Sequence, residues 1–399
     1  MRRATRWGIL AAALAAVVAI AALAGTTGSH AAPAAKKTVI IGWAFDQSGQ
    51  MAPFDNPALA AAGIRVKQIN AKGKYKFVIN TCDTQNNDAA KAKACALSLL
   101  GQGANIIFTT CDVDYATPVV QEVINHGKLA IAPCIGTDQM GPRRFGKKGK
   151  LAFSFGNVAQ DEGSAMAEYA YSRGWKTAGL ATNTRLVYFT NVVQAFDIRF
   201  RQLGGKIVDR ESYATGQNNV QSAVTRLNSH KAAVYVTSTA FGELPAFVSG
   251  MRSLHNNTPI LNSWAGDGTY WDTQNPKVTN YYCVTFASVF GDDPSAAVRK
   301  MIASLTAAGS PPGTGGFLGG ADAIDGVYTA IKRAHGSLKG SVLAAQLVHF
   351  NHVPVLGSRV SFSSKWHTVF GRQYRVIKTQ NNKAKRVGLV TAKVLPKIH

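Results

Sequence analysis

The sequence is poor in acidic residues. Its 21 Asp and Glu stand against 44 Lys and Arg, which gives a formal charge of +23. Such a charge favours anionic surroundings, and nucleic acid is one class of partner that it suggests. The basic residues are scattered, however, without a stripe of Arg and Lys interleaved with aromatic residues, and the last stretch, 378–397, is the part dense in cations. We therefore expect a solvated basic surface and no binding of nucleic acid.

The motifs of common enzyme and metal sites are also missing. The sequence has no GxSxG elbow, no HExxH pair and no GxxxxGK[ST] loop, and the glycine-rich stretch 313–320 follows no expected strand. His349 and His352 lie three positions apart, but no Cys or carboxylate accompanies them at the spacing of metal ligands. We expect no catalysis, no bound metal and no cofactor.

Cysteine is scarce and never has the CxxC spacing of zinc and redox sites. Four of the five cysteines, namely Cys82, Cys95, Cys111 and Cys134, lie within 53 positions of each other. They could form disulfides in an oxidising compartment. The odd total leaves at least one free thiol, and we expect this to be Cys283 because it lies in an apolar run typical of a buried strand.

Long apolar runs are absent after the first thirty residues. Near the start, three arginines precede an apolar stretch over 8–23, and small residues then lead to a cleavage site near Ala31. This order is typical of a secretory signal peptide over residues 1–31, and the apolar stretch is short for a membrane-spanning helix. We expect an exported protein, periplasmic, extracellular or in the cell envelope, that is soluble after cleavage.

From residue 37 onward, short apolar runs alternate with amphipathic segments. The pair Asn56-Pro57 predicts the start of the first helix, followed by apolar residues at spacings of three and four. Strands that are apolar on both faces are typical of parallel sheets covered by helices. The alternation restarts near residue 156, which predicts an α/β fold of two doubly wound, Rossmann-like lobes joined by a hinge.

In doubly wound sheets, ligands bind beyond the carboxyl ends of the strands. The loops there carry hydroxyls, small residues and the N-termini of helices in the first series, which favour a carboxylate. In the second series, Tyr188, Phe241 and Asp267 follow expected strands. The two aromatic residues could enclose an apolar side chain, and the carboxylate could pair with an ammonium group.

The order of elements resembles the type I periplasmic-binding fold, specifically the branched-chain amino-acid and amide-binding proteins of ABC importers. The resemblance covers about residues 38–380 and is carried by IGWAFDQSGQMAPFDNPALAAAGIRVKQINAKG, NTCDTQNNDAAKAKACA, GANIIFTTCDVDYATPVVQEVINHGKLAIAPC and FLGGADAIDGVYTAIKRA. We expect a first lobe from 37–155 and 285–355, and a second from 156–284 and 356–399. The lobes would close on a ligand bound between them.

The resemblance also implies which residues bind the ligand. In that family the first lobe holds the α-carboxylate after the third and fourth strands, aromatic residues enclose the side chain, and an acid binds the ammonium group. Asp112 and Asp114 stand where the family has hydroxyl residues and would repel a carboxylate, so an amide or a cation is an alternative ligand. The matching positions are Phe54, Cys111, Asp112, Val113, Cys134, Ile135, Gly136, Thr137, Tyr188, Phe241 and Asp267.

A disulfide of the family maps to Cys82 and Cys111, which leaves a pairing of Cys95 with Cys134 open. The resemblance implies a monomer that carries a small molecule, an amino acid, an amide or a related solute, to the membrane permease of an ABC importer. Two alternatives remain. One is a ligand-sensing module with the same pocket, and the other is an envelope protein that binds polyanions through its charge.

Overall fold

The computed structural model describes residues 36–398, so the expected signal peptide over residues 1–31 lies outside the described residues. In the part of the chain that is described, none of the helices combines the length and the apolar character needed to cross a bilayer.

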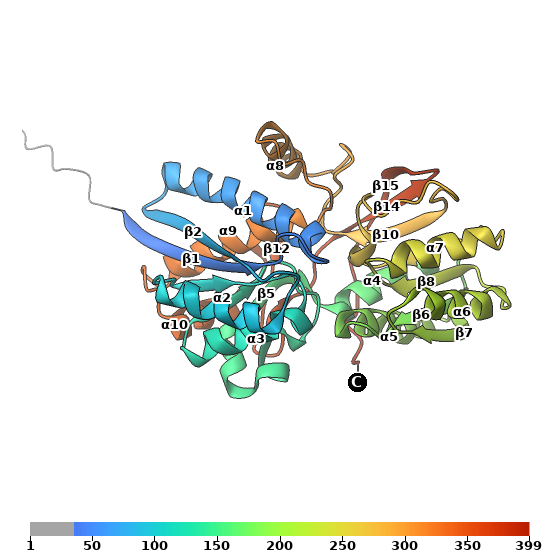
Figure 1. Cartoon of the computed structure of the whole chain (residues 1–399), viewed down its shortest axis with the longest axis horizontal. Helices are drawn as coiled ribbons and strands as arrows, with labels where there is room; N and C mark the ends of the chain where they lie inside the picture. The colour runs from blue at the N-terminus through green and yellow to red at the C-terminus, as the bar shows by residue number, and fades with distance from the viewer. Residues whose placement is uncertain (1–35, 399) are drawn as a thin grey trace, which may run out of the picture. The chain divides into compact units, whose positions relative to one another are not determined.

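The first of two large sheets is parallel throughout, in the order β2-β1-β3-β4-β5-β13 (Figure 1). Its central strands are apolar and buried on both faces, as expected for strands between helix layers. The strands are β1 (Lys37–Phe45), β2 (Tyr75–Asp83), β3 (Ile106–Phe108), β4 (Leu129–Ala132), β5 (Ala152–Asn157) and β13 (Thr368–Val369). The helices around this sheet are α1 (Ala52–Lys72), α2 (Ala89–Gly101), α3 (Val113–Asn125), α8 (Ala296–Ala307), α9 (Phe317–Arg333) and α10 (Gly340–Val348), with short turns η1 (Gln139–Arg143) and η2 (Gly146–Leu151).

The second large sheet has the order β15-β14-β10-β9-β8-β6-β7, parallel from β7 to β10 and antiparallel at β14 and β15. Its strands are β6 (Thr177–Asn183), β7 (Lys206–Tyr213), β8 (Val234–Ser238), β9 (Ile260–Asn262), β10 (Tyr281–Thr285), β14 (Tyr374–Gln380) and β15 (Lys383–Val390). Its helices are α4 (Ala159–Ser172), α5 (Val187–Gln202), α6 (Gln217–Asn228), α7 (Glu243–Ser253) and the short η3 (Trp264–Gly266). A small hairpin joins β11 (Val353–Pro354) and β12 (Arg359–Val360).

The chain passes between the two sheets three times, after β5, after β10 and after β13. The expected α/β fold of two doubly wound lobes is confirmed. The lobe boundaries remain a prediction, and one pairing bears on them. β13 lies in the segment 356–399 that we assigned to the second lobe, but it pairs with β5 of the first sheet.

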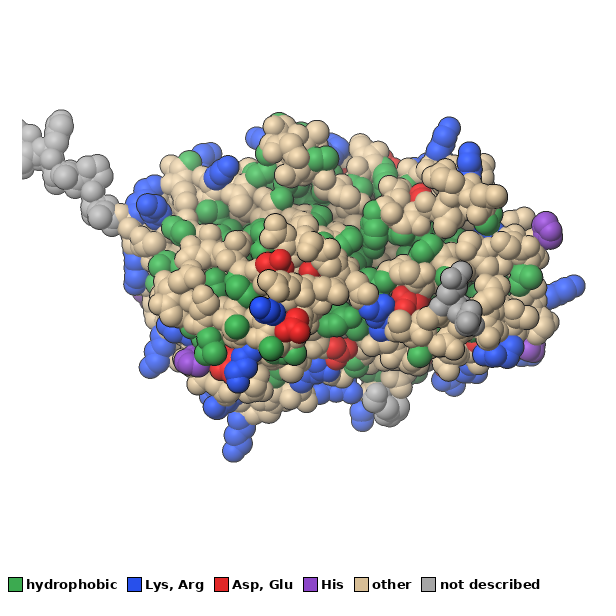
Figure 2. All heavy atoms as spheres, viewed as in Figure 1, with side chains coloured by type: hydrophobic (Ala, Val, Ile, Leu, Met, Phe, Trp, Pro, Cys, Tyr) green, Lys and Arg blue, Asp and Glu red, His purple; other side chains and the backbone are tan. Residues whose placement is uncertain are grey.

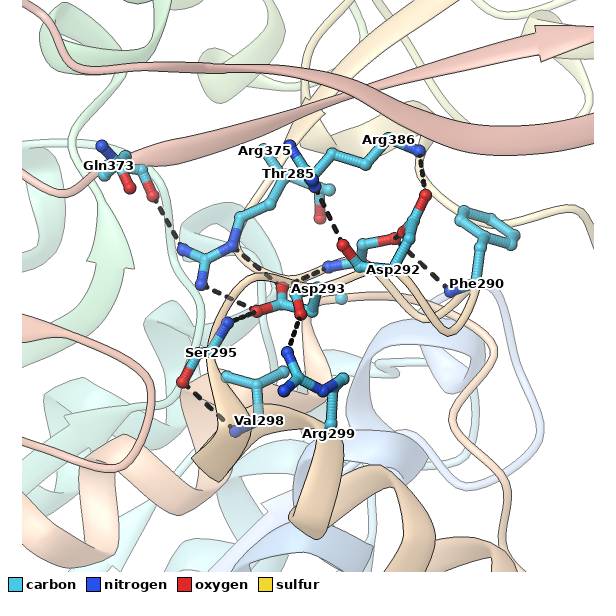
Figure 3. Close-up of polar contacts among 12 residues, drawn as sticks. Thr285, Phe290, Asp292, Asp293, Ser295, Val298, Arg299, Gln373, Arg375 and Arg386 are labelled. Atoms are coloured by element: carbon cyan, nitrogen blue, oxygen red, sulfur yellow. Dashed lines mark hydrogen bonds and ion pairs between the residues drawn. The ribbon is translucent and has the colours of Figure 1, made fainter.

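Asp293 fixes the second of these crossings (Figure 3). Its buried carboxylate binds Nε and Nη2 of Arg375 on β14 at 2.9 and 3.1 Å. The same carboxylate accepts the backbone N–H groups of Ser288 and Ser295, each at 2.8 Å. A buried carboxylate with four donors is well compensated for the loss of water. The segment between β10 and α8 is therefore tied to the start of β14.

Two disulfides join neighbouring elements of the first lobe, Cys82 with Cys95 and Cys111 with Cys134. The expected pairing of Cys82 with Cys111 is therefore wrong. β1 lies between β2 and β3, and positions two strands apart are separated by about 10 Å, too far for a disulfide. Cys95 instead comes from α2, which packs over β2, and Cys111 and Cys134 follow the adjacent strands β3 and β4. The open pairing of Cys95 with Cys134 is excluded, and Cys283 is buried and free as expected.

Candidate functional site

The loop after β3 does not offer its first amide to a ligand. The backbone N–H of Cys111, expected to bind a carboxylate, donates to Oδ1 of Asp55 at 2.9 Å. The other oxygen of Asp55 accepts the N–H of Asp46, also at 2.9 Å. Asp55 is fully buried, and this burial raises its pKa to about 7. An internal carboxylate from α1 therefore occupies the place that the sequence assigned to the ligand.

Asp112 caps the next helix. Its Oδ1 accepts the N–H groups of Asp114 and Tyr115 at 2.8 and 3.4 Å, so it satisfies the first turn of α3. Burial, and secondarily the nearby charge of Asp114, raises the pKa of Asp112 to about 7. Asp114 in turn binds Arg144 at 2.5 Å and accepts the N–H of Val187, at the start of α5, at 3.0 Å. This last hydrogen bond joins the two lobes.

The loop after β4 packs directly on the second lobe. Gly136 lies so close to the ring of Tyr188 that a Cβ atom there would be 2.5 Å from the ring's Cε2, so no larger residue fits. Thr137 Oγ1 accepts a hydrogen bond from Asn191 Nδ2 of α5 at 3.0 Å. The hydroxyl that the sequence assigned to a ligand thus contributes to contact between the lobes.

Glu162, which the sequence analysis did not select, contacts two aromatic residues of the second lobe, Tyr188 and Trp264. It is on α4 and is fully buried. Its Oε2 accepts the phenol O–H of Tyr188 at 2.8 Å, and its Oε1 accepts the backbone N–H of Trp264 at 2.7 Å. Burial raises the pKa of Glu162 to about 8. The carboxyl group therefore holds two aromatic residues of the second lobe in place.

Asp267, expected as the ammonium partner, is engaged within the protein. Oδ2 accepts the hydroxyl of Thr285 at 2.6 Å and the N–H of Gly315 at 2.5 Å, and Oδ1 accepts the N–H of Gly268 at 2.8 Å. The residue is 1% exposed, and burial raises its pKa to about 6. These bonds connect the loop after β9 to the end of β10 and to the segment before α9.

A small cavity of about 20 Å³ lies between the lobes. That volume accommodates roughly one water molecule. Phe54 of α1 meets the ring of Trp264 edge-on at 5.1 Å, and Tyr188 lies 6.1 Å from the same ring. The protein's own aromatic side chains therefore fill the cleft. The lining residues are Met51, Phe54, Cys111, Asp112, Leu186, Tyr188, Phe189, Ala240, Phe241, Trp264 and Ala265.

The structure thus brings together part of the expected set. Five predicted residues line the cavity, namely Phe54, Cys111, Asp112, Tyr188 and Phe241. The remaining six predicted positions, which include Asp267, are not in its lining, and their role in binding stays a prediction. Trp264 and Phe189 line it without having been selected, although Trp264 comes shortly after β9 and Phe189 lies in the first turn of α5.

Arg185 provides a positive charge beside the cavity. Its guanidinium lies 4.6 Å from the centre of the Phe241 ring, a cation–π distance, and 3.2 Å from the carboxylate of Glu243. It also donates a hydrogen bond to Gln50 of the first lobe. Arg185, Glu243 and Gln50 line a groove of about 520 Å³ next to the cavity. An anionic group placed at this groove would meet Arg185.

Solved structures of similar fold were found, but no curated protein matches in sequence. LivJ, a branched-chain amino acid transporter substrate-binding protein from Streptococcus pneumoniae in complex with isoleucine, has a TM-score of 0.76 and 19% identity, over 89% of this chain and 100% of that one. LivK, a leucine-binding protein from Thermotoga maritima, has a TM-score of 0.76 and 15% identity, over 88% and 98%. An ABC transporter solute-binding protein from Rhodopseudomonas palustris, in complex with 3,4-dihydroxybenzoic acid, has a TM-score of 0.75 and 14% identity, over 90% and 99%.

These likenesses are below 25% identity and describe the fold alone. The sequence model of the periplasmic binding protein family matches residues 38–384, most of the described chain. Its members are solute-binding proteins rather than enzymes. The chain belongs to the periplasmic binding protein family.

Proposed function

We propose that the chain is an exported receptor that binds a small aromatic or strongly apolar carboxylic acid between its lobes and delivers it to the permease of an ABC importer. The observation that carries the choice of ligand is the ring of aromatic side chains, Phe54, Tyr188, Phe189, Phe241 and Trp264, around the cavity. Sites lined by aromatic residues with few polar groups bind ligands that are themselves largely apolar.

The charges near the cleft support an acid rather than an amine. Glu162 and Asp267 both accept hydrogen bonds from within the protein, and Asp112 caps α3. An ammonium group would have to displace one of these contacts. Arg185 is also paired, with Glu243 and with Gln50, but its guanidinium lies at the groove next to the cavity, where a carboxylate could replace the neutral amide of Gln50. The dihydroxybenzoic acid held by the Rhodopseudomonas palustris protein has this combination of ring and carboxylate.

The lobe contacts show how binding would control closure. Three hydrogen bonds join the first lobe to α5 or to the loop just before it. They link Asp114 with Val187, Thr137 with Asn191, and Gln50 with Arg185. A ligand held at once by Phe54 and by second-lobe aromatics would strengthen this closed arrangement. A permease that recognises both lobes would then distinguish the loaded form.

A branched-chain amino acid is the second candidate, because the LivJ structure holds isoleucine. For such a ligand the sequence-based assignment of Asp267 would have to hold, with Asp267 released from Thr285 and Gly315 on binding.

The two candidates separate in one experiment. The thermal midpoint and the calorimetric affinity would be measured with benzoate, 4-hydroxybenzoate and 3,4-dihydroxybenzoate, and with leucine and isoleucine. We expect at least one aromatic acid to bind more tightly than either amino acid. Arg185→Ala should weaken its binding about tenfold or more, because hydrogen bonds to charged groups contribute roughly 1.5–3 kcal/mol.

Arg201→Ala is the matched control, since Arg201 lies on α5 of the same lobe and pairs with Asp197 at 2.9 Å outside the site. Its affinity should equal that of the unmodified protein. Tighter binding of leucine than of every aromatic acid would favour the amino-acid candidate. Equal affinity in Arg185→Ala would remove Arg185 from the site.

A further inference from the structure

The charge of the chain is concentrated toward its end. Asp325 is the last acidic residue, and the 74 positions that follow contain 13 Lys and Arg and no Asp or Glu. Several of the arginines are neutralised from earlier parts of the chain, for example Arg372 by Asp322 and Arg375 by Asp293. The lysines of the last twenty residues are different. In the described part of the chain no ion pair is found for Lys383, Lys385, Lys393 or Lys397.

These lysines lie on β15 and the segment after it. β15 forms one edge of the second sheet, next to β14 (Figure 1). Along β15 exposed residues alternate with half-buried ones, and the exposed set is Lys383, Lys385, Val387 and Leu389. Figure 2 shows Lys and Arg side chains protruding at the upper right, on the side where Figure 1 places β15.

Exposed apolar residues also gather here. Val387, Leu389 and Val394 are 38%, 41% and 39% exposed, and they are three of the six large exposed hydrophobic residues in the described chain. Lysines on an edge strand are commonly explained as protection against pairing with another chain. That explanation does not account for exposed Val and Leu on the same strand, which would favour such pairing.

A groove lies beside the end of β15. Its volume is about 400 Å³, and Leu389, Tyr169 and Leu203 contribute apolar surface to its lining. Lys393 and Arg199 line it as well. The acid in this groove, Glu168, is bound by Arg199 at 2.7 Å and by the backbone N–H of Lys393 at 3.2 Å. The groove thus combines an apolar wall with Lys393, for which no ion pair is found in the described residues, while Arg199 and Glu168 neutralise each other.

We propose that this basic edge, formed by Lys383, Lys385, Val387, Leu389 and the segment 393–397, docks on the surface of an anionic phospholipid bilayer. Unpaired lysines are attracted to anionic headgroups, and exposed Val and Leu can enter the boundary between headgroups and acyl chains. A soluble polyanion would use the lysines and leave the apolar residues exposed to water. Docking would concentrate the receptor at the membrane independently of which solute it binds.

The experiment measures binding of the purified protein to vesicles of phosphatidylcholine alone and of phosphatidylcholine with 30% phosphatidylglycerol, by co-sedimentation. We expect binding to the anionic vesicles alone, and its loss in about 0.5 M NaCl. The double variant Lys383→Glu with Lys385→Glu should lower the partition coefficient at least about tenfold. The variant Val387→Ser with Leu389→Ser should lower it about threefold or more.

Lys74→Glu with Lys76→Glu is the matched control. Lys74 and Lys76 are exposed at the start of β2, the edge strand of the first sheet, and the pair changes the net charge by the same amount. Its vesicle binding should stay within about twofold of the unmodified protein. An equal loss in this control would mean that net charge alone acts, and would overturn the proposal.

Two other results would also overturn it. One is equal binding to the neutral and the anionic vesicles. The other is unchanged vesicle binding in Val387→Ser with Leu389→Ser, together with equally tight binding of soluble polyphosphate, which would assign the surface to a soluble polyanion. Circular dichroism of each variant verifies that the fold is retained, so a loss of binding can be read as a surface effect.

Discussion

Replacing Glu162 by Gln tests the buried carboxyl group behind the cleft. Its pKa is raised from 4.5 to about 8, chiefly by burial. The folded chain therefore keeps a proton that the unfolded chain releases above pH 4.5. The stabilisation from this proton is complete below pH 4.5 and is lost as the pH rises through 8. Between pH 6 and 8 this group should lower the free energy of unfolding by about 2 kcal/mol, because the slope of about 1.4 kcal/mol per pH unit falls to half at the folded-state pKa.

Gln reproduces the protonated carboxyl group at this position. It retains an acceptor for the N–H of Trp264 and places a donor toward the oxygen of Tyr188. Glu162→Gln should therefore match the unmodified protein in stability below pH 4.5, be more stable by about 2 kcal/mol at pH 6, and be more stable by about 4 kcal/mol at pH 8. Urea unfolding followed by tryptophan fluorescence at pH 6 and at pH 8 measures the difference.

Buried acids away from Glu162 with raised pKa values, such as Asp55, add the same slope to both proteins, so they cancel in the difference. Glu168→Gln on the same helix is the control, since Glu168 is paired with Arg199. That variant should keep the pH dependence of the unmodified protein. The reasoning is refuted if Glu162→Gln loses as much stability between pH 6 and 8 as the unmodified protein does.

Three further changes have defined outcomes. Asp293→Asn leaves Arg375 buried without its partner and should lower the free energy of unfolding by about 3–5 kcal/mol, measured by urea unfolding; a change under about 1 kcal/mol would contradict the role given to this ion pair. Replacing Cys111 and Cys134 together by Ala opens a loop of 23 residues and should cost about 3 kcal/mol, which calorimetric melting would detect. Asp267→Ala leaves three donors unsatisfied and should cost about 1–3 kcal/mol of stability; a weaker affinity for leucine with no loss of stability would instead support its sequence-predicted role.

Much of the fold could be predicted because buried parallel strands have a local signature. The run 38–42 is largely apolar, and it lies inside β1, between β2 and β3 of the first sheet. The residue at which a helix begins was harder to predict. Asn56-Pro57 predicted the beginning of the first helix, but α1 starts at Ala52 and carries Pro57 within it. Pro53 already occupies the first turn, where a missing N–H costs nothing, so the later proline was the weaker signal.

The site was harder to predict because its partners are far apart in the sequence. Asp55 meets the amide of Cys111 across 56 positions, and Glu162 meets the amide of Trp264 across 102. A loop sequence shows that an amide is present at the end of a strand, but it does not show whether an internal carboxylate already binds it. The predicted disulfide pairing was wrong for a related reason, because the order of strands in the sheet decides which cysteines are neighbours.

The aromatic contacts across the cleft support the proposal that the ligand is an aromatic acid. Phe54 meets Trp264 at 5.1 Å and Tyr270 at 6.3 Å, and such pairs contribute about 0.5–1.5 kcal/mol each beyond the area that they bury. A ligand that enters between the lobes must replace these contacts. An aliphatic amino acid gives up the ring–ring interactions and needs a carboxylate for its ammonium group, while Asp267 and Glu162 are engaged elsewhere. An aromatic acid would restore ring contacts on both sides and add a carboxylate for Arg185, so we propose that the side chains that close the cleft select for it.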